Sequence, residues 1–271
     1  MACPRPAEVP VFLLCGGRGT RLGETCRTTP KPMVEIGDRP ILVHIMDRYA
    51  RFGFRRFILC TGWRSEVIVR FFLDFRGLTE DFTIETRTGQ IVFHQSGATP
   101  DWEVTVAHTG PRAMTGARIA RAAARYLGES EHFAVTYGDG LTDVDLAAEF
   151  AFHLDHGRIG TVLAIHPVSP FGHFALREDE AVDFVEKPVL ADTWANGGFF
   201  FFRRRFLEYL STDDDCVLEG EPLRRLIAER ELKPFYHHGF WSAMDTLKDR
   251  DRMHALWESG AAPWRGPEAG R

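Results

Sequence analysis

Two short segments carry residues whose types and spacing suit chemistry on phosphates. An apolar run leads into Cys15-Gly16-Gly17-Arg18-Gly19-Thr20-Arg21-Leu22. Small residues there let backbone N–H groups approach a phosphate or a base closely, and Arg21 adds a fixed positive charge. Lys31 stands between two prolines, which restrict the backbone and hold the lysine in place. We therefore expect this region to bind a polyanion.

Two aspartates are candidate metal ligands. Asp139 ends an apolar run and lies between two glycines, and Asp245 follows the aromatic pair Phe240-Trp241 in a Met-Asp-Thr sequence. Carboxylate oxygens suit Mg²⁺, which proteins hold with one or two carboxylates plus substrate phosphates. Taken alone, each aspartate is as easily explained as a turn or helix-cap residue. Residue type and spacing alone do not pair these two aspartates as one site.

Two familiar glycine motifs do not fit the loop after the first apolar run. A P-loop needs Gly-Lys-Ser/Thr five positions after its first glycine, and neither Gly16 nor Gly17 has that continuation. A dinucleotide fingerprint needs a glycine where Leu22 stands. The loop therefore argues against a P-loop nucleotidase and disfavours a dinucleotide-dependent dehydrogenase.

Other polar clusters indicate no second chemistry. His153 and His156, like His237-His238, lack carboxylates or cysteines at ligand spacing, and 213–215 is most simply a solvated acidic loop. The cysteines are odd in number and far apart, which fits neither a disulfide framework nor a zinc site. We interpret them as reduced, mostly buried thiols of a cytoplasmic protein. The five are Cys3, Cys15, Cys26, Cys60 and Cys216.

Around these segments the sequence alternates between strand-like and helix-like stretches. Apolar runs that end in turn residues predict buried strands, and apolar residues at helical spacing predict the helices between them. In the first 165 residues we expect strands at 9–15, 57–60 and 132–137, and helices at 41–52, from Ser65, from Thr115 and from Asp143. Ser65 and Thr115 are the expected N-caps. Further strands are expected at 159–166, 174–177, 181–185 and 198–202, and helices at 221–230 and 246–257. This order predicts an α/β protein whose mixed, mostly parallel sheet carries helices on both faces.

Composition narrows the class of protein. The chain has 271 residues, 44% of them hydrophobic, with a formal net charge of −5, which is ordinary for a soluble globular protein. The negative net charge argues against a nucleic-acid partner. No stretch approaches the roughly 18 apolar residues that span a bilayer, and the N-terminus does not resemble a secretory signal. We therefore expect one domain that works in the cytoplasm, with neither nucleic acid nor membrane as partner.

The order of the motifs resembles that of the sugar-1-phosphate nucleotidylyltransferases, and most of all the branch that joins CTP to glucose 1-phosphate. The matching segments are 16–22, 30–37, 40–46, 114–118, 136–140, 186–188, 196–200, 221–223, 239–241 and 244–247. The resemblance implies a Rossmann-like three-layer α/β/α fold of the nucleotide-diphospho-sugar transferase type. It also implies one domain with a nucleotide-binding half (1–165), a sugar-phosphate-binding half (166–260) and a short tail (261–271).

The resemblance implies a role for each matching residue. Arg21 and Lys31 would be the catalytic cations facing the triphosphate, and Asp139 and Asp245 would bind Mg²⁺. Lys187 would bind the sugar phosphate, and the sugar hydroxyls would meet Glu186, Asn196 and Gly197. The nucleotide-binding set is Leu14, Cys15, Gly16, Gly17, Arg18, Gly19, Thr20, Arg21, Lys31, Thr115, Gly116, Arg118 and Gly138. Despite the negative net charge, the cations at 18, 21, 31, 118 and 187 should converge on one pocket.

The implied reaction is attack by a phosphate oxygen of α-D-glucose 1-phosphate on the α-phosphorus of CTP, which gives CDP-glucose and pyrophosphate. Charge neutralisation and positioning dominate such chemistry, and no general base is needed because the attacking oxygen is already ionised. Two alternatives stay open: the same reaction with dTTP, UTP or another sugar 1-phosphate, and a non-catalytic homologue that only binds nucleotide sugars. The resemblance also implies a homo-oligomer.

Five positions depart from the family pattern. Cys15 stands where alanine is usual, a tolerable change because both residues are small. Thr29 replaces a lysine before Pro-Lys-Pro, and Ala113 stands where a hydroxyl residue is usual. Ala117 replaces a second glycine, and Pro170 stands where an arginine often precedes Phe-Gly. We expect the core chemistry to survive these changes and the base and sugar specificity to be what they affect.

Overall fold

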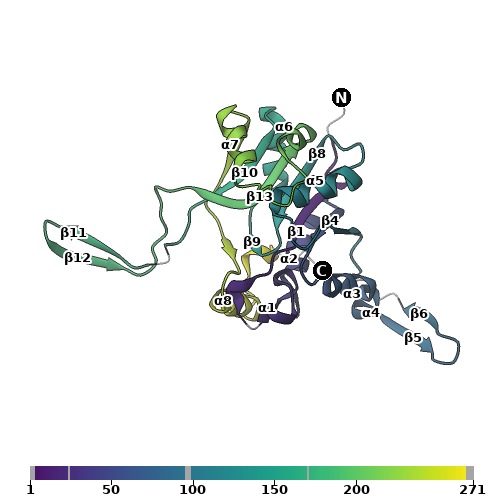
Figure 1. The fold of residues 1–271 in the computed structure, drawn as a ribbon. Helices are drawn as coiled ribbons and strands as arrows, with labels where there is room; N and C mark the ends of the chain where they lie inside the picture. Colours follow the sequence, from purple (N-terminus) through teal and green to yellow (C-terminus); the bar gives the residue numbers. More distant parts are fainter. Residues whose placement is uncertain (1–3, 24, 95–98, 170, 267–271) are drawn as a thin grey trace.

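A computed structural model of the chain describes residues 4–23, 25–94, 99–169 and 171–266, and a seven-stranded sheet forms its centre (Figure 1). The strands, in spatial order, are β14 (Leu232–His237), β10 (Gly160–Ile165), β13 (Ala195–Arg203), β8 (His132–Tyr137), β1 (Val11–Cys15), β4 (Arg56–Thr61) and β7 (Glu103–His108). β8, β1, β4 and β7 are parallel to one another. β13 runs antiparallel to β8 and β10, and β14 is parallel to β10. The predicted mixed, mostly parallel sheet is confirmed.

Helices cover both faces of the sheet because strand side chains alternate between two apolar cores. All five residues of β1 are buried; Val11, Leu13 and Cys15 enter one core, and Phe12 and Leu14 enter the other. Burial on both faces is what a central parallel strand requires. The first core includes residues of α2 (Ile41–Arg51), α3 (Ser65–Leu73), α6 (Leu146–His156) and α8 (Leu247–Glu258), and the second includes residues of α5 (Thr115–Tyr126) and α7 (Glu221–Ala228). This three-layer arrangement confirms the expected fold class.

Two hairpins leave the body in different directions (Figure 1). One consists of β5 (Asp81–Glu85) and β6 (Gln90–His94), and the other of β11 (His173–Arg177) and β12 (Glu180–Val185). We expected the second pair of strands to continue the central sheet, and that expectation is wrong. A tight turn with Glu178 at φ 55° pairs β11 with β12 locally, and every residue of both strands is exposed. The β5–β6 hairpin was not predicted.

Short elements complete the chain and bring distant segments to the sheet. β9 (Gly140–Thr142), directly after β8, pairs with β15 (Trp241–Ala243). The remaining elements are η1 (Pro6–Glu8), η2 (Thr20–Leu22), α1 (Thr25–Thr28), η3 (Lys31–Met33), β2 (Glu35–Ile36), β3 (Arg39–Pro40), α4 (Phe75–Thr79), η4 (Arg204–Tyr209) and η5 (Pro263–Arg265). None of the helices in the described ranges combines the length and hydropathy that a bilayer-spanning segment needs.

Three helices begin differently from the expectation. Ser65 and Thr115 are the first residues of α3 and α5, and neither acts as an N-cap. α6 begins at Leu146 and is capped by Asp145, whose carboxylate accepts a hydrogen bond from the Ala148 backbone. Hydroxyl and carboxylate groups that other partners engage are not free to cap, and Thr115 is such a case.

The expected tail, 261–271, is described as far as residue 266, and residues 267–271 lie outside the described residues. Ala262 and Trp264 are buried in the first core, and Trp264 packs against Phe240 with ring centroids 5.4 Å apart. Residues 261–266 are therefore part of the packed domain.

Candidate functional site

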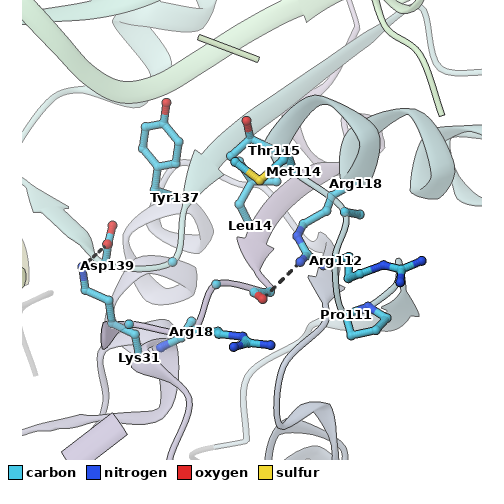
Figure 2. A pocket seen from close by; sticks show the side chains of 16 residues that line it. Leu14, Arg18, Lys31, Pro111, Arg112, Met114, Thr115, Arg118, Tyr137 and Asp139 are labelled. Atoms are coloured by element: carbon cyan, nitrogen blue, oxygen red, sulfur yellow. Dashed lines mark hydrogen bonds and ion pairs between the residues drawn. The ribbon is translucent and has the colours of Figure 1, made fainter. Parts of the chain in front are cut away.

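A cavity of about 470 Å³ opens where β1 and β8 end (Figure 2). These strands are parallel neighbours, so their carboxyl ends lie at the same edge of the sheet. This edge is where open α/β sheets hold ligands. The cavity is lined by Leu14, Gly16, Gly17, Arg18, Gly19, Lys31, Pro32, Pro111, Arg112, Ala113, Met114, Thr115, Arg118, Tyr137, Gly138 and Asp139. Nine of the thirteen expected nucleotide-binding residues are among them.

Lys31 joins the two expected metal ligands at one side of the cavity. Its Nζ lies 2.5 Å from Asp139 Oδ2 and 2.8 Å from Asp245 Oδ1. A backbone hydrogen bond of 2.9 Å from Met244 N to Asp139 O aligns the two aspartate segments. Burial alone would lower the pKa of Lys31, but the two carboxylates outweigh it and raise the pKa above the ordinary 10.5. The lysine is therefore charged across the physiological pH range.

The donor set at this point suits a hard divalent cation. Two carboxylates converge on a single positive centre, and each side chain is partly exposed, at 25% for Asp139 and 35% for Asp245. Over the described ranges, no group of three or more His, Cys, Asp and Glu side chains could enclose a metal. Mg²⁺ commonly takes one or two carboxylates and completes its shell with water and substrate phosphates. The residues present therefore fit such a metal.

The Arg118 guanidinium supports the glycine loop, residues 16–19, through a hydrogen bond to its backbone. It donates hydrogen bonds to Gly16 O (3.1 Å), Thr61 O (3.0 Å), Gly110 O (2.9 Å) and Thr109 Oγ1 (2.9 Å). A Cβ at position 16 would lie 2.0 Å from Arg118 Cζ, so only glycine fits there. Arg118 thus holds the loop in shape, and Figure 2 shows its contact with the loop.

The charge around the cavity is mainly positive. Burial lowers the pKa of Arg118, yet an arginine stays protonated in a protein. All four of the hydrogen bonds that Arg118 donates go to neutral oxygens. Arg18, Lys31 and Arg112 add three more cations against the Asp139 carboxylate of the lining. Arg112, which the sequence did not single out, also pairs with Asp214 at 3.2 Å. The lining therefore carries four cationic side chains and one carboxylate.

Several expected nucleotide-binding residues lie beside the cavity without lining it. The Cys15 side chain is buried in the first core, and Thr20 begins η2. A Cβ at Gly116 would come within 2.6 Å of Cys216 Sγ, which explains this glycine by helix packing. The side chain of Arg21, an expected catalytic residue, lies outside the described part of the structure.

The departures from the family pattern fall in different places. Ala113 lines the cavity, whereas Ala117 is fully buried on α5. Thr29 lines a separate hollow with Met33 and Arg250. Pro170 lies outside the described residues. Of the described departures, only Ala113 is therefore placed where it meets a ligand.

The expected sugar-binding residues divide into two groups. Asn196, at the start of β13, donates a hydrogen bond of 3.3 Å to the Tyr137 hydroxyl, so it is linked to the cavity wall. The neighbouring Gly197 carbonyl accepts from Trp241 Nε1 at 2.6 Å. Glu186 and Lys187 follow β12 at the base of the exposed hairpin, and neither lines the cavity. The expected convergence of Lys187 with the other cations is not observed.

Tyr137 lines the cavity, and Glu219, which does not line it, contacts Tyr137; neither residue was predicted. The Glu219 carboxylate accepts hydrogen bonds from both the Tyr137 and the Thr115 hydroxyl. Tyr137 lies inside the recognised segment 136–140, next to Asp139. Glu219 precedes the segment 221–223 by two positions, and no spacing rule connects it to residues about a hundred positions away.

Comparison with known proteins gives one consistent result. A family model described as nucleotidyl transferase matches residues 11–242. The chain is 40% identical over 253 residues to "Glucose-1-phosphate cytidylyltransferase" of Salmonella typhimurium, covering 93% of this chain and 97% of that protein. It is 37% identical to "Probable glucose-1-phosphate cytidylyltransferase" of Bacillus subtilis, covering 93% and 98%. Among solved structures, HddC from Yersinia pseudotuberculosis matches with a TM-score of 0.62 at 18% identity, over 92% of this chain and 99% of that one.

Proposed function

The chain belongs to the nucleotidyl transferase family, and from that premise we propose that it condenses CTP with α-D-glucose 1-phosphate to CDP-glucose and pyrophosphate. The relatives that carry this activity in their names match at 37–40% identity along nearly their whole length. The observation that carries the proposal is the meeting of Lys31, Asp139 and Asp245 beside a glycine-rich loop. That arrangement combines a phosphate cradle with fixed charges of both signs.

CTP would occupy the cavity with its phosphates toward Lys31. Backbone N–H groups of residues 16–19 can approach the phosphates closely, and Arg18, Arg21 and Lys31 would neutralise their charge. Leu14, Thr115 and Gly138 would meet the base and ribose, and Gly138 suits this because a Cβ there would lie 2.8 Å from Pro32. Four residues would contribute indirectly, by fixing the shape of the loop and of the start of α5, without touching the nucleotide. They are Cys15, Thr20, Gly116 and Arg118. This is the role we assign to the nucleotide half, 1–165.

Asp139 and Asp245 would hold Mg²⁺ at the point where their carboxylates now meet Lys31. When bound, the metal would supply positive charge that neutralises the substrate phosphates. Lys31 would face the phosphates, where its ammonium group would stabilise the charge that develops on the departing pyrophosphate. The attacking oxygen of glucose 1-phosphate is already ionised, so the protein needs to position it rather than deprotonate it.

The sugar half, 166–260, would supply Asn196 and Gly197 at the cavity and Glu186 and Lys187 from the hairpin base. Asn196 supports this most directly, because Tyr137 links it to the cavity wall. Glu186 and Lys187 would have to approach when the sugar phosphate binds. Lys187 lies in a turn with φ 50°, next to the Val168–Val189 bridge that anchors the hairpin.

We also propose that the enzyme is a homo-oligomer in the cytoplasm. A two-stranded hairpin is marginally stable alone in water, yet β11–β12 exposes Phe174, Leu176 and Phe184 at 64%, 68% and 51%. Packing against another copy would bury these side chains. The four described cysteines are all free thiols, which agrees with a reducing compartment. Light scattering of the purified protein should give a mass that is a multiple of 30.7 kDa. A monomer at micromolar concentration would contradict the proposal.

The activity is tested by supplying glucose 1-phosphate and Mg²⁺ with CTP, dTTP, UTP, ATP or GTP in turn and measuring pyrophosphate. We expect CTP to give the highest kcat/KM by at least tenfold. Higher turnover with dTTP or UTP would replace the nucleotide in the proposal but keep the chemistry. A lack of product with every nucleotide and with other sugar 1-phosphates would favour a non-catalytic nucleotide-sugar-binding protein.

A further inference from the structure

Four polar side chains and one backbone N–H form a continuous chain of hydrogen bonds, and two of these side chains, Tyr137 and Thr115, line the cavity. Asn196 Nδ2 donates to the Tyr137 hydroxyl at 3.3 Å, and that hydroxyl donates to Glu219 Oε1. From the other side, the Leu218 backbone N–H donates to Thr115 Oγ1 at 2.9 Å, and Thr115 donates to Glu219 Oε2 at 2.7 Å. Both branches end at the same carboxylate.

The direction of every hydrogen in this chain follows from the chemistry of its last member. An ionised carboxylate only accepts hydrogen bonds, and a hydroxyl has one hydrogen to give. Tyr137 and Thr115 therefore each donate their one hydroxyl hydrogen to the Glu219 carboxylate. Toward the cavity, both oxygens present only lone pairs.

The Tyr137 ring is fixed in place by its neighbours. Gly198 has φ 79°, and a Cβ there would lie 2.2 Å from Tyr137 Cδ2, so the ring rests directly on the glycine backbone. On another side, the ring meets Phe200 edge-on with centroids 6.2 Å apart. The Asn196 amide is oriented as well, because its Oδ1 accepts from Gly198 N at 2.8 Å. The phenol oxygen therefore has a set position beside Asn196.

We infer that Glu219 is a positioning residue that makes this wall an acceptor, so that the cavity selects ligand groups that donate hydrogen bonds. Under the proposed function, on which this inference rests, the donor at Tyr137 is a hydroxyl of the sugar 1-phosphate. Figure 2 shows Tyr137 and Thr115 projecting to the same side of the cavity, on the far side of Leu14 from Arg18. A sugar carrying fluorine or hydrogen in place of that hydroxyl cannot donate and should be rejected.

The test compares glucose 1-phosphate with its 2-, 3-, 4- and 6-deoxyfluoro analogues as substrates for wild type and Glu219→Gln. For wild type, at least one analogue should lose tenfold or more in kcat/KM. Glutamine offers one acceptor and one donor, so one of the two hydroxyls must turn its hydrogen toward the cavity. In Glu219→Gln we therefore expect KM for glucose 1-phosphate to rise about tenfold with a smaller change in kcat. The penalty for the same analogue should shrink at least threefold.

Two further variants separate positioning from stability. Tyr137→Phe removes the acceptor itself and should show the same reduced penalty, while a melting curve verifies that it folds. Glu229→Gln is the matched control, because Glu229 accepts from the Tyr209 hydroxyl away from the cavity lining. It should leave all kinetic constants unchanged. An active wild type with the same analogue penalties in Glu219→Gln would overturn the inference alone. An inactive wild type would overturn the proposed function and this inference with it.

Discussion

Lys31 Nζ and Asp245 Oδ1 lie 2.8 Å apart although 214 positions separate them in the chain. Three structural features create this contact. The prolines around Lys31 set its short helix η3, β9 pairs with β15, and a backbone hydrogen bond joins Met244 to Asp139. The charged centre therefore forms only when the first and last parts of the domain fold together.

Replacing Lys31 by methionine should leave the fold intact and remove most of the activity. Two nearby carboxylates would lose their common cation, and the triphosphate would lose a charge that stabilises the departing pyrophosphate. We expect kcat to fall by about 10³-fold, within the range that single preorganised charges contribute. Lys248→Met, on the exposed side of α8, is the matched control and should keep wild-type kcat. Turnover within fivefold of wild type in Lys31→Met would remove Lys31 from the catalytic set.

Gly16 and Gly17 are adjacent glycines with opposite structural requirements. A Cβ at position 16 would overlap the Arg118 guanidinium, whereas a Cβ at position 17 has no atom within 4 Å. Gly16→Ala should therefore destabilise the protein by about 1–3 kcal/mol, the usual cost of overpacking, and raise KM for CTP. Gly17→Ala should melt with the wild type. Equal urea midpoints for all three proteins would contradict the proposed support of the loop by Arg118.

Glu149 should make the protein less stable as the pH rises. It is fully buried, neither carboxyl oxygen has a hydrogen-bond partner in the described ranges, and burial raises its pKa well above 4.5. The folded state therefore holds a proton that the unfolded chain releases above pH 4.5, so stability is lost as the pH rises above that value. Glutamine does not ionise and escapes this loss.

The corresponding measurement is urea unfolding of wild type and Glu149→Gln between pH 5 and pH 8.5. The free energy of unfolding of Glu149→Gln should increase relative to wild type with each step in pH. Glu129→Gln, at an exposed position, provides the control and should give a constant difference. A pH-independent difference for Glu149→Gln would show that Glu149 is ionised in the folded protein.

The sequence was most informative where local chemistry and fold agree. β8 begins and ends where its apolar run predicted, because both of its faces are buried and it lies inside the sheet between β13 and β1. Lys31, Asp139 and the glycine loop were likewise recognisable from the sequence. Prolines flank Lys31, and glycines flank Asp139 and make up much of the loop, so the neighbours along the chain identify all three.

Other features depend on contacts that a single sequence does not display. β11 and β12 have the composition of sheet strands, and only their local pairing keeps them outside the central sheet. The helix-start hydroxyl of Thr115 looks like a cap until Glu219 is seen beside it. Glu219 itself sits in Leu-Glu-Gly, a sequence with no chemical pattern of its own.

The most direct measurement of the central claim is pyrophosphate release from CTP and glucose 1-phosphate by wild type and Asp139→Asn. Asparagine keeps the size of the side chain but removes the charge that faces Lys31 and would hold Mg²⁺. We predict CDP-glucose formation by wild type and a fall in kcat of at least 10²-fold in Asp139→Asn, with an unchanged melting temperature. Near-normal turnover by a folded Asp139→Asn protein would contradict the account.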